Sequence, residues 1–103
     1  MVHFHGGGAI AGDASFDNFL CARYAVECHV TVINANYRLA PENKAPAGIL
    51  DAYGVVKWVL EHADNLKIDV NRVGVIGYDA GGYIASGCAM HFAKKGEEHL
   101  LKF

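Results

Sequence analysis

Apolar residues in this chain fall into short β-favouring runs that alternate with stretches of helical periodicity. Runs of β-branched and aromatic side chains suit a pleated, half-buried surface and predict strands. These predicted strands cover residues 2–5, 29–34 and 72–76. Elsewhere apolar side chains recur at intervals of three and four, which is typical of amphipathic helices. The predicted helices cover residues 16–27, residues from Pro46 to about Ala63, and residues 81–95.

Each predicted helix has one apolar face. The expected buried side chains are Phe16, Phe19, Leu20 and Tyr24 in the first helix, Ile49, Tyr53, Val56, Leu60 and Ala63 in the second, and Ile84, Cys88 and Phe92 in the third. Asp13 or Ser15 is available to cap the first helix. Gly96, which follows two lysines, predicts the end of the third helix. Residues 64–71 are expected to form a polar loop.

The order of these elements, β-α-β-α-β-α, predicts the fold class. Crossovers of a dozen residues or more favour a parallel sheet with right-handed connections and helices on both faces, an α/β fold. The length of 103 residues fits a single domain, 1–103. Three strands are few, because sheets average about five to six strands. The chain also opens directly on a strand, and residues 97–103 lead toward a further element. We therefore expect a truncated domain.

Composition excludes several classes of partner. The chain is 52% hydrophobic and 19% charged with a net charge of −2, which indicates a core-forming protein without the basic surface that nucleic acid requires. No apolar run approaches the roughly 20 residues needed to span a membrane. The three cysteines cannot all pair with one another, so buried free thiols and a cytoplasmic location are expected. The oligomeric state stays open.

Two glycine-rich segments carry the candidate chemistry. Residues 72–82 read RVGVIGYDAGG, a strand, a glycine-framed turn and a helix, which is the layout of a nucleophile elbow, G-x-S-x-G, with Asp79 at the tip. The segment His5-Gly6-Gly7-Gly8 follows the first strand. Its glycines allow a tight turn that points amide groups into a cavity. The helix after Asp79 begins with free backbone amides, and the positive end of its dipole favours negative charge there.

These motifs, together with YRLAPE at residues 37–42 and DAY at residues 51–53, give the chain a clear family resemblance. It resembles the hormone-sensitive-lipase-like branch of the α/β hydrolases, which includes arylacetamide-deacetylase-type and plant carboxylesterases. The resemblance implies a partial α/β-hydrolase fold, a carboxylic-ester hydrolase without a cofactor, and a small-molecule ester-like ligand. It also assigns an oxyanion hole to Gly6, Gly7 and Ala80, in a loop that includes His5 and Gly8.

The chain departs from that family at decisive positions. Asp79 stands where the family has its serine, and Tyr78 stands where an acidic residue is usual. Ser86 lies seven residues beyond the tip and cannot substitute. The acid and histidine of the family triad are expected beyond residue 103. Loss of a serine nucleophile costs on the order of 10⁶ in turnover. An ionised Asp79 would also take the amides meant for the oxyanion. We therefore expect a catalytically inactive relative.

Two other interpretations stay open. Epoxide hydrolases and haloalkane dehalogenases are α/β hydrolases that use an elbow aspartate as the nucleophile. Their elbow resembles this one, except that tryptophan typically follows the aspartate and here Ala80 does. A relative that binds a small ligand without catalysis is the third interpretation. His3 and His5 share one strand face and could hold a metal, but packing roles are favoured and no metal is expected. Arg38 and Glu42 are expected to fix their loop.

Overall fold

The computed structural model describes residues 1–103 and contains a three-stranded parallel sheet. Strands β1 (Val2–Phe4), β2 (Ile33–Ala35) and β3 (Val75–Gly77) lie in the order β2-β1-β3. The central strand β1 pairs with both neighbours, so that Phe4 lies opposite Ala35 on one side and Gly77 on the other. The carboxyl ends of all three strands therefore meet at one edge of the sheet.

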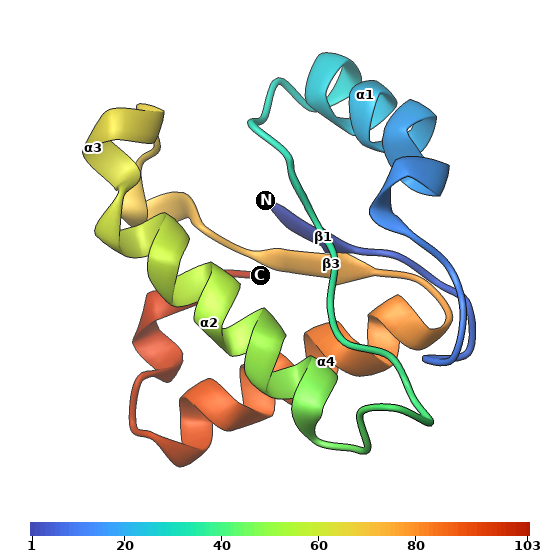
Figure 1. Cartoon of the computed structure of the whole chain (residues 1–103). Helices are drawn as coiled ribbons and strands as arrows, with labels where there is room; N and C mark the ends of the chain where they lie inside the picture. Colours follow the sequence, from blue (N-terminus) through green and yellow to red (C-terminus); the bar gives the residue numbers. More distant parts are fainter.

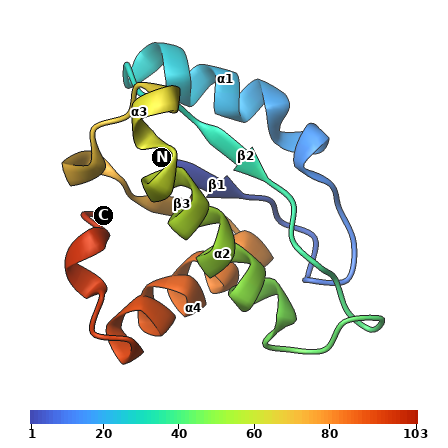
Figure 2. The same cartoon turned by 60° about the vertical axis from the view of Figure 1, so that its left-hand side comes forward.

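Helices cover both faces of this sheet, which confirms the predicted α/β arrangement (Figures 1 and 2). Helix α1 (Asn18–Glu27) lies on one face, and α2 (Ala47–Glu61) and α4 (Ala80–Lys94) lie on the other. Helix α4 packs directly on β1 and β3, and α2 packs on α4. Alternation along β1 follows the same division: Val2 and Phe4 belong to the main core, while His3 faces the aromatic ring of Tyr24 in α1.

Two predicted strands begin too early. The segment at 29–34 starts with a turn, because His29 has a left-handed backbone (φ 52°) after the end of α1. The segment at 72–76 starts with the end of a 3-10 helix, η2 (Val70–Arg72), which the Asp69 side chain caps through the amide of Asn71. Pairing with β1 begins only after these local turns end.

The main core lies between the sheet and the helix pair α2 and α4. The predicted buried residues of α4, Ile84, Cys88 and Phe92, are confirmed. In the predicted stripe of the second helix, Val56 and Ala63 are buried as expected, whereas the other deeply buried positions are Ala52 and Val59, one residue before the predicted Tyr53 and Leu60. Helix α2 packs against α4, and its buried side chains belong to the same core as those of α4. Ile49 packs close to Gly87, and the ring of Tyr53 lies 4.7 Å from that of Phe92.

The predicted apolar face of the first helix is wrong. Phe16 and Phe19 are each 78% exposed, and Cys21 is the buried residue of α1. Residues 14–17 form a 3-10 helix, η1 (Ala14–Asp17), in which the Asp13 carboxylate accepts a hydrogen bond from the amide of Ser15. Phe16 therefore lies in η1 and not in the helix that the sequence predicted for it.

The segments after α2 and α4 contain short elements. The predicted loop at 64–71 includes most of a short helix, α3 (Ala63–Leu66), as well as η2. Gly96 has a positive φ of 71° just beyond α4 and confirms the predicted stop. A 3-10 helix, η3 (Glu98–Leu100), follows. The last residues then run beside the entry to β3, where the amide of Lys102 donates to Val73 and the amide of Val75 donates to Phe103.

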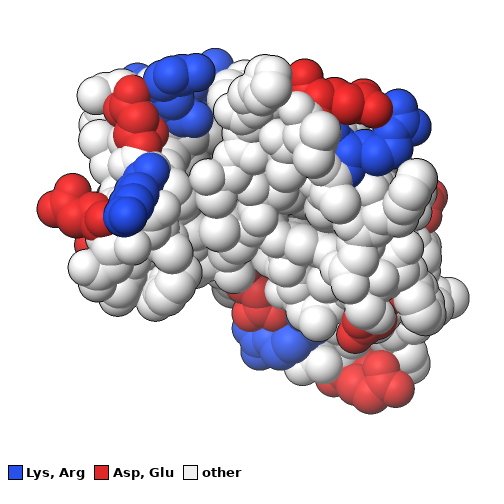
Figure 3. All heavy atoms as spheres, turned by 90° about the horizontal axis from the view of Figure 1, so that it is seen from above, with Lys and Arg blue, Asp and Glu red and all other residues white.

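The surface and the cysteines complete the description. On the face shown in Figure 3, Lys and Arg side chains lie beside Asp and Glu, with uncharged surface between these mixed groups. No helix has both the length and the apolar character that a membrane crossing would need. All three cysteines are free thiols. Cys21 and Cys88 are buried as predicted, whereas the predicted burial of Cys28 is wrong, because it lies exposed at the end of α1.

Candidate active site at the β3–α4 turn

The turn between β3 and α4 holds Asp79 in a rarely populated backbone conformation. Its φ of 53° and ψ of −127° are unusual for a residue with a side chain, and such strain concentrates at functional sites. Two glycines allow the turn. A Cβ on Gly81 would lie 1.9 Å from the carbonyl oxygen of Phe4, and one on Gly77 would lie 2.3 Å from the carbonyl carbon of Gly81. Close packing of α4 on the sheet thus places Asp79 at the carboxyl ends of the strands.

The side chain of Asp79 is bound by the glycine-rich loop after β1. Its Oδ2 atom accepts hydrogen bonds from the amides of Gly7 at 2.9 Å and Gly8 at 3.1 Å. The amides of Gly7, Ala80 and Gly8 lower the pKa of this carboxyl below its usual value. Asp79 is exposed and has no ion-pair partner. The site is therefore a carboxylate that backbone donors hold in its charged form.

The structure brings most of the predicted site residues together. Gly7 and Gly8 each donate an amide hydrogen bond to Asp79, and the amide of Ala80 also lowers the pKa of its carboxyl. Gly6 lies beside them in a different way: a Cβ there would meet the ring of Tyr78 at 3.0 Å and the Asp79 side chain at 3.3 Å. The loop turns through positive φ values at Gly7 (121°) and Gly8 (65°). This backbone geometry decides which amides face the carboxylate.

His5 supports the glycine-rich loop through contacts of its buried ring. Its buried ring stacks on Tyr37, with ring centroids 4.5 Å apart, and its Nδ1 donates to the carbonyl of Gly6 at 2.7 Å. The Tyr37 hydroxyl in turn donates to the carbonyl of His5. His3 has different partners, because its Nδ1 donates to the side chain of Asn34 at 3.2 Å. Neither histidine hydrogen-bonds to Asp79, and no group of three metal-ligating side chains forms in the chain.

Arg38 fixes the loop that follows β2. Its guanidinium donates to both oxygens of Asp51 in α2, and its backbone amide donates to the same carboxylate. This contact lowers the pKa of Asp51. The predicted structural role of Arg38 is confirmed, whereas Glu42 is exposed and forms no ion pair.

Sequence reasoning missed the contact between Tyr78 and Asp17. The Tyr78 hydroxyl donates to Oδ1 of Asp17 at 3.1 Å, across 61 residues of sequence. Asp17 is buried beside a hollow of about 280 Å³ that His5, Gly6 and Tyr78 also line. An aspartate at the start of a helix is ordinary, and nothing local predicted its burial.

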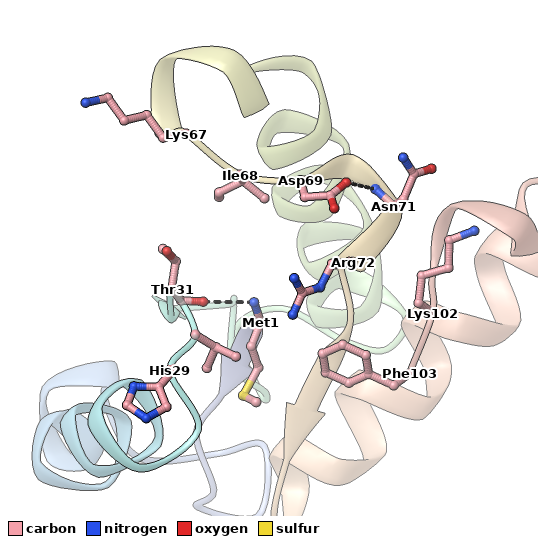
Figure 4. A pocket seen from close by; sticks show the side chains of 11 residues that line it. Met1, His29, Thr31, Lys67, Ile68, Asp69, Asn71, Arg72, Lys102 and Phe103 are labelled. Carbon is pink, nitrogen blue, oxygen red and sulfur yellow. Dashed lines mark hydrogen bonds between the residues drawn. The ribbon is translucent and has the colours of Figure 1, made fainter.

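A second cavity, of about 420 Å³, lies at the amino ends of the strands (Figure 4). Met1, Thr31 and Arg72 line it, and the amino group of Met1 donates to the carbonyl of Thr31 at 2.9 Å. Lys67 extends away from the other labelled side chains (Figure 4). None of the predicted site residues lines this cavity. The predicted site residues around Asp79 therefore lie apart from this cavity, at the carboxyl ends of the strands.

Comparisons with known proteins agree with this geometry. A family described as "alpha/beta hydrolase fold" matches residues 1–103. Esterase LipI of Mycobacterium tuberculosis is 41% identical over 86 residues, which cover 84% of this chain and 27% of that protein. The ethyl acetate hydrolase of Pseudomonas putida is 35% identical over 97 residues, which cover 94% of this chain and 30% of that protein.

Solved structures give the same picture. An esterase of Pyrobaculum calidifontis superposes with a TM-score of 0.94 at 38% identity, covering 98% of this chain and 33% of its own. A bacterial heroin esterase superposes with a TM-score of 0.89 at 36% identity, covering 92% of this chain and 30% of its own. The chain thus spans about a third or less of the length of these relatives.

Proposed function

This chain belongs to the alpha/beta hydrolase fold family, in its carboxylesterase-like branch, and from that membership we propose that the Asp79 site derives from an ester-hydrolysing site that no longer hydrolyses esters. The observation that carries the proposal is the pair of hydrogen bonds from Gly7 and Gly8 to Oδ2 of Asp79. In an ester hydrolase, amides in such a position stabilise the oxyanion that forms during acyl transfer. Here a permanent carboxylate takes them.

The proposed oxyanion-stabilising groups are backbone amides. We keep Gly6, Gly7 and Ala80 as the proposed set and add Gly8, because its amide faces the same carboxylate oxygen as that of Gly7. Donors of an oxyanion hole lie about 2.7–3.1 Å from the oxygen that they stabilise. The two glycine distances fall in that range. The carboxylate therefore mimics the anion that the loop would otherwise bind.

Two physical effects oppose ester hydrolysis. A carboxylate at the elbow repels the negative charge that develops on the carbonyl oxygen of an ester under attack. Its hydrogen bonds also keep the amides from reaching that oxygen. Neither serine can replace it: Ser15 and Ser86 are both exposed, and Ser86 lies in α4 beside a different hollow, together with Val75. The proposed result is a site with anion-binding geometry and no serine chemistry.

A second candidate function uses Asp79 itself as the nucleophile. Both glycine amides hold Oδ2, which leaves Oδ1 as the oxygen not engaged by that loop. Attack of Oδ1 on a haloalkane carbon would form an alkyl ester and release halide, and attack on an epoxide carbon would form the ester and leave an alkoxide that takes a proton from water. Water would then hydrolyse that ester, which requires a general base. No histidine of residues 1–103 hydrogen-bonds to Asp79, so this candidate needs a base from elsewhere.

A third candidate is a binding protein for a small ester-like molecule. We propose no nucleic-acid partner, since charges of both signs are mixed on the surface in Figure 3. The three free cysteines support a reducing, cytoplasmic location. Tight binding of a small ester-like molecule without turnover would favour the third candidate function, a binding protein.

The experiment that separates the candidates is a paired assay of the native protein. It is incubated with aryl esters and with epoxides, alongside its Asp79→Ala variant, and the intact mass is followed. A silent esterase site turns over neither substrate class. An aspartate nucleophile turns over epoxides and gains the mass of the substrate at Asp79. Ester turnover that Asp79→Ala abolishes would overturn the first proposal.

A further inference from the structure

Tyr78 and Asp79 are adjacent in sequence, but their side chains bind different segments. Asp79 accepts hydrogen bonds from Gly7 and Gly8 in the loop after β1. The Tyr78 hydroxyl donates to Oδ1 of Asp17 at the end of η1. The turn between β3 and α4 is therefore hydrogen-bonded to two segments: Asp79 at its tip binds the loop after β1, and Tyr78 binds η1.

Asp17 is well placed to hold Tyr78 still. Its side chain is 7% exposed, and it lies where η1 passes into α1. Its second oxygen, Oδ2, receives no hydrogen bond and lies 3.9 Å from Nε2 of His3 on the central strand. The other nitrogen of His3 donates to Asn34, whose amide group donates to the Ala14 carbonyl and to the Asn18 side chain. The carboxylate that accepts from Tyr78 therefore lies buried beside His3 of the central strand.

The ring of Tyr78 lies against the glycine-rich loop. A Cβ on Gly6 would lie 3.0 Å from Cε2 of Tyr78, so the ring lies on the side of Gly6 where a side chain would project. Tyr78 is 52% exposed, and burial alone does not fix its position. The hydrogen bond to Asp17 is the side-chain contact that orients the ring.

We propose that Asp17 is a positioning residue of the Asp79 site, and that it acts through Tyr78 to set how closely the amides of Gly7 and Gly8 approach the side chain at position 79. Release of the Tyr78 hydroxyl lets the ring swing into solvent and removes the support of the loop at Gly6. The amides of Gly7 and Gly8 then retreat from Asp79. The proposal rests on the proposed function only in treating position 79 as the chemical centre.

The test reads the Asp79 carboxyl directly by NMR titration of its ¹³C signal in the full chain. In the natural sequence its pKa lies below the ordinary value, because the amides of Gly7, Ala80 and Gly8 bind it. Tyr78→Phe and Asp17→Leu should each raise this pKa toward the ordinary value, and the double variant should raise it no further. The matched control is Tyr83→Phe, which changes another half-exposed tyrosine whose hydroxyl binds no side chain.

The outcome does not depend on turnover, so it is separate from the fate of the esterase proposal. An unchanged Asp79 pKa in folded Tyr78→Phe protein would overturn the positioning role. An equal shift in Tyr83→Phe would overturn it as well. Because Asp17 is buried, its replacement can unfold the chain; the half-exposed Tyr78 provides the decisive variant in that case.

Discussion

The amide of Gly7 lies 2.9 Å from Oδ2 of Asp79, although 72 residues separate them in the sequence. This contact joins the loop after the central strand to the tip of the turn before α4. Under the proposed function, the Asp79 carboxylate occupies the place where backbone amides would stabilise the negative charge of an ester-hydrolysis intermediate. The family's fold is retained, and we propose that Asp79 opposes ester hydrolysis within it.

Acid should weaken this contact. Backbone donors lower the pKa of Asp79 in the folded chain, so its contribution to stability is present above the unfolded pKa of about 3.9 and is lost as the pH falls through the lower folded value. The difference in unfolding free energy between the natural chain and Asp79→Asn should be constant above about pH 5 and shrink in stronger acid. Urea unfolding across this range measures it. If this difference in unfolding free energy does not change with pH, the hydrogen bonds to the Asp79 carboxylate do not stabilise the folded chain.

The titration of Tyr78 should report the nearby carboxylate. The hydrogen bond to Asp17, followed by the charge of Asp17, raises the pKa of the Tyr78 phenol above its usual value. Asp17→Asn removes the charge, so the phenol should ionise at lower pH. Ultraviolet absorbance of tyrosinate follows the change, with Tyr78→Phe identifying the signal. A phenol that titrates identically in both proteins would show that the contact is absent in solution.

Close packing at Gly81 should tolerate no side chain. Gly81→Ala would place a Cβ 1.9 Å from a backbone carbonyl of β1, so we expect a loss above ~4 kcal/mol or failure to fold. Gly54→Ala is the matched control, since its Cβ would meet nothing within 4 Å in the middle of α2. That change should stabilise the chain by about 0.5–1 kcal/mol. Thermal and urea unfolding measure both effects; a tolerated Gly81→Ala would refute the packing described here.

The three thiols should react at very different rates. Cys28 is exposed, Cys21 is buried, and burial raises the pKa of Cys88 to about 12. A thiol reagent at pH 8 should therefore modify one cysteine quickly and the other two only after denaturant is added. Peptide mapping should assign the fast site to Cys28. Rapid modification of Cys88 in the folded chain would mean that the core between α2 and α4 opens readily.

The parts of the fold that sequence predicted well depend on strict periodicity. The stripe of Ile84, Cys88 and Phe92 repeats every four residues on a helix with a clear stop at Gly96, and it is buried as expected. The face of α1 was not predictable in this way. Phe16 belongs to the 3-10 helix η1 before it, and Phe19, the first apolar residue of the predicted face within α1, is exposed.

Some features of the candidate site were also predictable from the sequence, and others were not. Glycine spacing placed Asp79 at the tip of a turn, because a close helix–strand approach requires small residues there. The choice of Gly8 beside Gly7 as a donor depends on backbone angles that composition does not specify. The contact between Tyr78 and Asp17 joins residues 61 positions apart and has no local signature.

We propose that Asp79 prevents ester hydrolysis, and the rate at which the native protein hydrolyses a simple aryl ester tests this proposal most directly. We expect a rate no higher than that of Asp79→Ala, and a gain of several orders of magnitude for Asp79→Ser where the acid and histidine partners are present. Efficient hydrolysis by the native protein that disappears in Asp79→Ala would contradict it.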